Sequence, residues 1–191
     1  MNDATEAPKV SPVGNWYRLI EMPQLYGGNP PVMVGHYYQV IRVEGSNFWV
    51  RDHGGHETSF GSSRFDLEHP VVLPSPREIL ASQKEWRKWA ASTKPIKEWY
   101  VAEGSTQGMG WTCRLMSTTD GWYVVVGLRH ANGLSRNASS YWLTRIPILG
   151  VDNPDPGGMW KMGEVALRTI FDTSAPHFPR GRGSSLKPAV P

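Results

Sequence analysis

Several features of secreted and membrane proteins are scarce or missing in this sequence. Its 191 residues include a single cysteine, Cys113, so no disulfide forms within the chain, as suits a reducing compartment. No run of apolar residues approaches the roughly 18 that a membrane-spanning helix needs. The first 20 residues hold acids and prolines where a signal peptide has an apolar stretch. These absences predict a cytoplasmic protein with no membrane partner.

Motifs for catalysis and cofactor binding are also lacking. The glycine-rich segment 104–110 has neither the lysine nor the Ser/Thr of a P-loop, and we interpret it as a mobile loop. Cys113 lies mid-strand on the same face as Leu115, which favours a buried structural thiol over a nucleophile with His130 as its base. The acids are scattered, and no spacing selects a carboxylate pair for hydrolysis. We therefore predict no catalytic residue and no cofactor.

One cluster of potential metal ligands needs a separate interpretation. The turn at 52–57 (DHGGHE) places His53 and His56 three residues apart, beside two carboxylates. Zinc requires three or four converging ligands, whereas side chains at a tight β-turn point in different directions. We therefore favour solvent-facing turn histidines and predict no metal. A small hydrolase or transferase that uses this turn is the least favoured alternative.

Charge of one sign does not dominate, but the charges are unevenly distributed. Twenty Lys+Arg against 17 Asp+Glu give a formal net charge of +3. Residues 1–72 hold five basic and eight acidic residues, whereas residues 73–191 hold fifteen basic and nine acidic residues. The change falls near a proline-marked break at 70–76. The sequence therefore predicts two units with different surfaces.

Tryptophan is the residue in excess. Nine tryptophans, seven tyrosines and five phenylalanines occur in a chain that is 39% hydrophobic and 19% charged, a composition that supports a packed core. A Trp ring serves either a core or a contact surface. Because the tryptophans are spread along the chain, we expect most of them in the core. Trp16, Trp49 and Trp86 are predicted to be structural, and Trp122 and Trp142 are the candidates for contact.

The first half of the chain has a β pattern. Residues 1–13 are polar and proline-containing, and are predicted to form a flexible arm. Alternation of apolar and polar residues then predicts short strands at 16–20, 35–43, 48–51 and 57–60. A long loop follows the first strand, tight turns separate the others, and a one-turn helix or bend follows at 62–65.

This succession resembles an SH3-like small barrel. The resemblance rests on the segments WYRLI, GHYYQVIRV, FWVRDHGG, ETSF and SSRFDL, within residues 14–72, about a third of the chain. It implies a binding surface more often than catalysis. Such barrels are common in accessory proteins of phages and mobile elements. The resemblance therefore implies an accessory protein of that kind, placed in the host cytoplasm if a phage encodes it.

The second half combines two helices with strands. A linking helix over 73–92 is predicted from the capping box of Ser75 and Glu78, with Pro76 at its first position. An aromatic-rich α+β domain over 93–172 follows, with a hairpin at 117–121, an edge strand that contains Pro147, and an amphipathic helix.

The tail at 173–191 is basic and rich in Pro and Gly, and it is predicted to be disordered. The predicted fold class is therefore α+β and mostly β. It comprises an SH3-like small barrel, a linking helix, and a second antiparallel β unit with a C-terminal helix and a flexible basic tail.

A basic loop at 129–137 lies between two aromatic-rich strands and is the leading candidate for a binding site. Cations and rings in this combination are used by proteins that bind single-stranded nucleic acid, and also by protein interfaces. We predict a non-enzymatic protein that contacts nucleic acid or a nucleoprotein complex. The alternative is a protein–protein inhibitor or assembly module with Trp/Tyr anchors. The candidate residues for nucleic-acid or partner binding are Arg114, Trp122, Arg129, His130, Arg136, Tyr141, Trp142 and Arg145.

Overall fold

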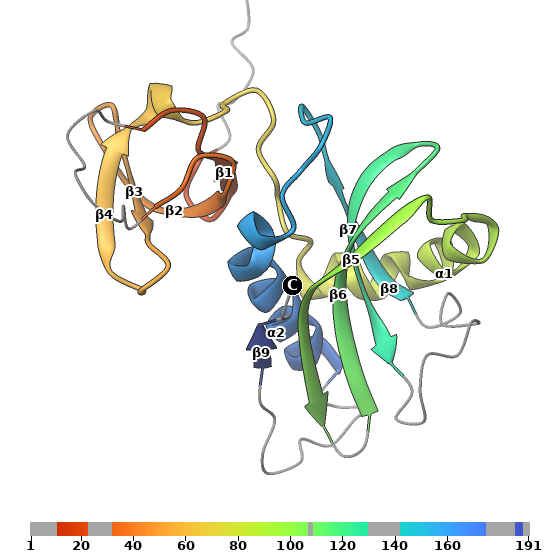
Figure 1. Ribbon diagram of the computed structural model, residues 1–191. Coiled ribbons are helices and arrows are strands. Elements are labelled where there is room, and N and C mark those ends of the chain that lie inside the picture. Colours follow the sequence, from red (N-terminus) through yellow and green to blue (C-terminus); the bar gives the residue numbers. More distant parts are fainter. Residues whose placement is uncertain (1–10, 23–31, 107–108, 130–141, 175–185, 189–191) are drawn as a thin grey trace, which may run out of the picture.

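The chain is mostly β, with two antiparallel sheets and two long helices (Figure 1). The computed structural model describes residues 11–22, 32–106, 109–129, 142–174 and 186–188. Neither α-helix of this described part combines the length and the apolar composition needed to cross a membrane.

The first sheet is formed by β1 (Trp16–Arg18), β2 (Tyr37–Glu44), β3 (Asn47–Arg51) and β4 (Glu57–Gly61), in that order. The predicted strands are thus confirmed, and the one-turn helix η1 (Ser62–Arg64) follows as expected. The sheet buries an aromatic and aliphatic cluster of its own: Tyr17, Leu19, Val32, Tyr38, Val40, Phe48, Val50, Phe60 and Phe65.

The predicted barrel closure is not found, because no sheet of the described residues closes into a barrel. In place of a closing strand, the first strand region meets the segment after β4 through two isolated bridges. Leu19 pairs with Phe65, and Trp16 pairs with Val71.

The second sheet has the order β8-β7-β6-β5-β9. Its strands are β5 (Lys97–Thr106), β6 (Met109–Thr118), β7 (Gly121–Arg129), β8 (Trp142–Ile148) and β9 (Leu186–Pro188). The predicted hairpin is confirmed, with Gly121 at φ 128, a value that favours glycine. The strand that contains Pro147 is at the edge, as predicted.

Two predictions of irregular structure are wrong in the described parts of the chain. Gly104 pairs with Trp111 and Ser105 pairs with Gly110, so both ends of the predicted glycine-rich loop belong to β5 and β6. Within the predicted disordered tail, 186–188 form β9 against β5. In both segments the main chain pairs with a neighbouring strand, and this pairing cannot be inferred from residue type alone.

The linking helix α1 (Pro76–Ser92) begins and ends as predicted. The Glu78 amide donates to Ser75 Oγ at 3.4 Å, and the Ser75 amide donates to Glu78 Oε2 at 2.7 Å, completing the capping box. α1 lies against β8 and α2 (Trp160–Ser174). A second one-turn helix, η3 (Gly157–Met159), leads into α2.

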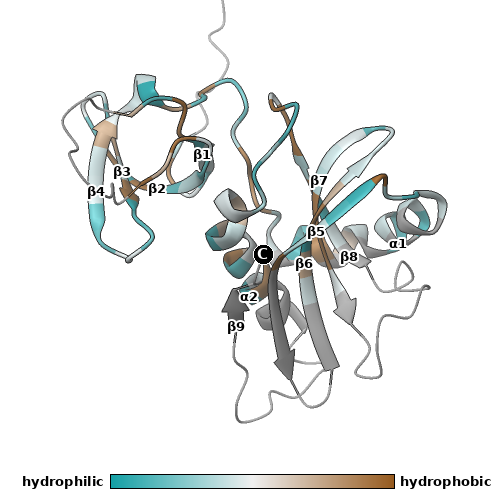
Figure 2. Ribbon diagram, in the orientation of Figure 1, coloured by the Kyte–Doolittle hydropathy of each residue, from teal (hydrophilic) through white to brown (hydrophobic). Residues whose placement is uncertain are grey.

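One hydrophobic core joins the two halves of the chain. Trp16, Tyr37 and Val71 from the first sheet region pack in the same buried cluster as Leu115 of β6 and Met162 of α2. In Figure 1, α2 lies between the two sheets, and Figure 2 shows hydrophobic residues in the central part of the second sheet. α2 contacts β2 of the first sheet and β5 and β6 of the second. The β8–α2 connection, residues 149–159, therefore lies at the junction of the two sheets.

Candidate functional site

The eight predicted contact residues fall into three groups. The side chains of Arg114, Trp122 and Arg145 are described. Arg129 ends β7 and Trp142 begins β8, and their side chains lie outside the described part. The remaining three lie outside the described residues altogether: His130, Arg136 and Tyr141.

Arg114 is buried in the second sheet. The residue is only 6% exposed, and its guanidinium donates a hydrogen bond to the Glu98 carboxylate on the neighbouring strand. Its Cζ also lies 4.7 Å from the centre of the Tyr100 ring. These contacts neutralise the cation within the sheet, so Arg114 is not presented to a phosphate.

Trp122 is partly buried and packs against the core. Its ring stacks on Trp99 with 5.6 Å between the ring centres, and both pack against the main buried cluster. The indole Nε1 donates to the Asp152 carbonyl at 3.0 Å. These contacts hold the Trp122 ring against the core, and its role in partner contact stays a prediction.

Arg145 lies among rings, as predicted, but these rings include one on the linking helix. Its Cζ is 4.6 Å from the centre of the Trp89 ring and 5.4 Å from that of Tyr123. Its Nη2 is 4.0 Å from the Glu85 carboxylate, and the side chain is 26% exposed. Arg145 thus joins β8 to α1 and β7 through cation–π contacts.

More accessible basic side chains occur on α1 and on its connection to β5. Segment 84–97 holds five basic residues and one acid. All four of its lysines are exposed, and none of them forms an ion pair with another described residue: Lys84, Lys88, Lys94 and Lys97. We name these four side chains the lysine surface. The density of Lys and Arg in segment 84–97 indicates these exposed cations in the sequence itself. Our prediction from aromatic residues placed the contact at 129–137 and did not use that density.

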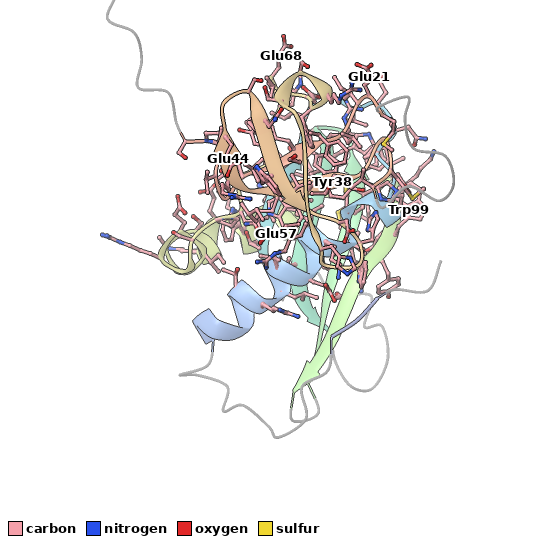
Figure 3. All side chains as sticks on the ribbon, turned by 90° about the vertical axis from the view of Figure 1, so that its left-hand side faces the viewer. Glu21, Tyr38, Glu44, Glu57, Glu68 and Trp99 are labelled. Carbon is pink, nitrogen blue, oxygen red and sulfur yellow. The ribbon has the colours of Figure 1, made fainter. Side chains whose placement is uncertain are left out.

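The first sheet has the opposite character. Carboxylates are spread over the face that Figure 3 presents, at Glu21, Glu44, Glu57 and Glu68, all of them exposed. Three of these carboxylates are paired with arginines of the same unit: Glu21 with Arg64, Glu44 with Arg42 and Glu57 with Arg51. The exposed lysines of segment 84–97 have no such partner among the described residues.

A second candidate site is a histidine cluster at the junction of the two sheets. His36 Nδ1 lies 3.0 Å from His53 Nε2, and the Tyr38 hydroxyl lies 3.0 Å from the same His53 nitrogen. His36 Nε2 is 3.1 Å from Asp155 Oδ2. The prediction of solvent-facing turn histidines is confirmed for His56, whose side chain is 84% exposed, and is wrong for His53.

The groups around this cluster shift its titration. Burial lowers the pKa of His53, and the nearby His36 and Lys161 lower it further, while Asp52 acts in the opposite direction. Burial also raises the pKa of Tyr38 to about 12. The pair is therefore arranged to keep His53 neutral and Tyr38 protonated at neutral pH.

A third polar group crosses the same junction. Arg18 Nη2 donates to Asp66 Oδ2 at 3.0 Å and to the Gly150 carbonyl at 3.1 Å, and His69 Nδ1 lies 3.1 Å from Asp66 Oδ1. Burial acts to raise the pKa of Asp66, but the hydrogen bonds from Arg18 and His69 outweigh it and hold the pKa below the usual value. This arrangement fastens the first sheet to the β8–α2 connection.

Cys113 is fully buried, as predicted, and burial raises the pKa of its thiol, so the reactive thiolate is disfavoured.

Within the described ranges, no group of three or more His, Cys, Asp or Glu side chains is arranged to hold a metal ion. The described polar groups that we consider as candidate sites are the lysine surface and the histidine cluster. In comparisons with known proteins, no family model, curated protein or solved structure matched the chain.

Proposed function

We propose that this protein is a non-enzymatic binding protein that contacts nucleic acid or a nucleoprotein complex through the lysine surface. The observation that carries the proposal is the exposure of Lys84, Lys88, Lys94 and Lys97 without an acidic partner among the described residues. An exposed, unpaired lysine is free to neutralise a phosphate and release its counterion.

The position of the lysines suits a phosphate backbone. Lys84 and Lys88 are four residues apart and thus lie one helical turn apart on the same side of α1. Lys94 and Lys97 extend this charge beyond the end of the helix into β5. Ile96, which is 64% exposed between them, adds an apolar group that can contact a sugar or a base.

The first sheet fits a supporting role in this proposal. We propose that residues 14–72 share the strand arrangement of an SH3-like small barrel without its closure, since the strand order, η1 and the bridges of Leu19 and Trp16 are compatible with that arrangement. Its arginines are paired with carboxylates, as Arg42 is with Glu44 and Arg51 with Glu57, so this unit offers a phosphate fewer free cations than the lysine surface does. An accessory protein of a phage or other mobile element, acting in the cytoplasm, is consistent with this design.

The salt dependence of binding tests the proposal. Four lysine–phosphate contacts on duplex DNA give a slope of about −3.6 for log affinity against log salt concentration, and on a single strand about −2.8. Between about 50 and 200 mM salt, affinity should therefore fall roughly 150-fold for a duplex and roughly 50-fold for a single strand. Fluorescence anisotropy with short labelled DNA and RNA measures these slopes.

A charge-matched pair of variants locates the contact. The double variant Lys84→Gln/Lys88→Gln should reduce the duplex slope to about −1.8, because two phosphate contacts are lost. The control Arg51→Gln/Arg168→Gln removes the same charge from exposed sites outside the lysine surface and should leave the slope near that of the wild type. No binding at low salt, or equal losses in both variants, would contradict the proposal.

One observation favours a second candidate, a protein–protein module. Ile20, Met33 and Val34 are each about half exposed, at 47%, 50% and 51%. The hydrogen bond from the Gly35 amide to the Leu19 carbonyl brings their two segments together. An exposed group of large apolar side chains is typical of a protein contact. Loss of partner capture in Met33→Ser/Val34→Ser, with nucleic-acid binding absent in the wild type, would favour this candidate.

A further inference from the structure

Tyr100 of β5 is the one exposed ring among the aromatic side chains that the structure describes. The residue is 39% exposed, and the Arg114 guanidinium lies over one face of the ring, with 4.7 Å between Cζ and the ring centre. Arg114 is itself held by an ion pair with the Glu98 carboxylate, so the two charges neutralise each other. The ring therefore has a fixed support on one face, and its exposed part lies away from that support.

Tyr100 and the helix α1 lie on the same side of the second sheet. Tyr100 pairs with Arg114 across β5 and β6, and Arg114 pairs with Val125 across β6 and β7, so these three side chains are on one face. Trp89 of α1 packs against Val125 and against Met116, which is two residues from Arg114 on β6. The helix that carries Lys84 and Lys88 thus covers part of the face to which Tyr100 belongs.

The strand edge beside Tyr100 is open in the described part of the chain. β9 pairs with residues 102–104 of β5 and not with 97–101. α2 covers the other face of β5, where Trp99 packs against the main buried cluster. A flat group can therefore reach the Tyr100 ring without displacing β9 or α2.

Cations of the lysine surface lie close to this ring along the chain. Lys97 is three residues before Tyr100 on β5, which places their Cα atoms about 10 Å apart. Lys94 lies in the short connection between α1 and β5, and Ile96 between the two lysines is 64% exposed. A chain of nucleotides whose phosphates contact these lysines therefore has an exposed ring within reach of its bases.

We infer that the lysine surface binds single-stranded nucleic acid, with a base stacked on the ring of Tyr100. The inference rests on the proposed function and names the class of ligand for it. In a duplex the faces of the bases are covered by their neighbours, so the ring adds nothing to the binding of paired DNA. In a single strand every base has a face available, and stacking on an aromatic side chain is tolerant of sequence. Arg114 orients the ring before binding, so little conformational entropy is lost when a base stacks on it.

The first sheet has a ring of similar construction, which supplies a matched control. The Arg42 guanidinium lies 4.0 Å from the centre of the Trp49 ring, and the Glu44 carboxylate accepts hydrogen bonds from both side chains. Residues 14–72 contain no lysine. Trp49→Leu therefore removes a ring with an arginine against it from a unit outside the lysine surface.

Abasic DNA tests the inference on the wild-type protein. A labelled oligothymidylate and an abasic strand of equal length carry the same number of phosphates and differ in the bases. In fluorescence anisotropy, the wild type should bind the abasic strand about 5- to 150-fold more weakly, the factor that corresponds to one stacked base. The salt slopes for the two strands should be equal, because stacking releases no counterions.

Variants of Tyr100 locate the stacked base. Tyr100→Leu should weaken the binding of oligothymidylate by the same factor, and should bind the abasic strand as the wild type does. Its salt slope and its affinity for duplex DNA should not change. Tyr100→Phe retains the ring and should bind as the wild type does, and so should Trp49→Leu. Circular dichroism and thermal unfolding establish that each variant is folded.

The outcomes separate this inference from the proposed function. Equal affinities of the wild type for the two strands, undiminished single-strand binding in Tyr100→Leu, or equal losses in Tyr100→Leu and Trp49→Leu would overturn the stacking of a base on Tyr100. The proposed function would still stand on a salt slope that is reduced in Lys84→Gln/Lys88→Gln. If no nucleic acid binds at low salt, both are wrong. If Tyr100→Leu does not fold, the comparison of the two strands with the wild type decides.

Discussion

Gly158 is a position at which the junction has little room for added volume, and part of what surrounds it is backbone. An ideal Cβ there would lie 2.9 Å from His36 Cδ2, 3.0 Å from His36 Cα and 3.1 Å from His36 Cγ. Favourable carbon–carbon contacts are about 3.5–4.0 Å, so Gly158→Ala requires a shift of about half an ångström or more. One of the contacted atoms is backbone, and the His36 ring is held by Asp155 and His53, so the strain has no easy release.

Overpacking of this kind costs about 1–3 kcal/mol in the free energy of unfolding. For a chain of this size, such a loss lowers Tm by about 2–12 °C. Urea denaturation followed by tryptophan fluorescence measures the change. An unchanged m-value shows that the variant exposes the same surface on unfolding as the wild type does.

The neighbouring glycine supplies the matched control. An added Cβ at Gly157 would meet only the Asp155 carboxylate, at 3.5 Å or more, which is an ordinary contact. Gly157→Ala should therefore stay within about 0.5 kcal/mol of the wild type, as surface substitutions do. Equal stabilities of Gly157→Ala and Gly158→Ala, or a Gly158→Ala variant as stable as the wild type, would refute this account of the junction.

Two further predictions concern buried titratable groups. The thiol of Cys113 should react with an aromatic disulfide reagent only upon unfolding, because it is fully buried and burial raises its pKa; rapid labelling of the native protein would contradict this. Asp66→Asn should lower the urea midpoint at neutral pH and reduce the loss of stability in acid. The lowered pKa of Asp66 makes its contribution complete above 3.8 and lost as the pH falls through the folded value. Midpoints at neutral and acidic pH measure this, and an unchanged acid dependence in Asp66→Asn would count against it.

The elements that were predictable from the sequence are those whose causes are local. The capping box of Ser75 and Glu78 defines the start of α1 from residues three apart, and Asp120 with Gly121 marks the β6–β7 hairpin. Both signals act within a few residues of chain, so tertiary contacts did not override them.

The candidate sites were less predictable because their partners are distant in sequence. A histidine at a turn is usually solvated, and nothing near His53 in the sequence shows that Tyr38 and His36 approach its ring. The sequence around Trp122 likewise predicts an exposed anchor. Its contacts with Trp99 and with the Asp152 carbonyl involve residues far away in the sequence. The neighbours of such side chains are determined by tertiary packing, and this packing depends on the strand register across the whole sheet.

The shared core also bears on the order in which the molecule can fold. Arg18 donates to the Gly150 carbonyl across 132 positions of sequence, and Trp16 and Tyr37 pack in the same cluster as Met162. Contacts of such high sequence separation form late, because the loops that they close are long. During synthesis, the first sheet therefore leaves the ribosome well before the helix against which Trp16 and Tyr37 pack, and these rings stay uncovered until α2 arrives. The core that contains Trp16 of β1 is therefore complete only after α2 has been synthesised.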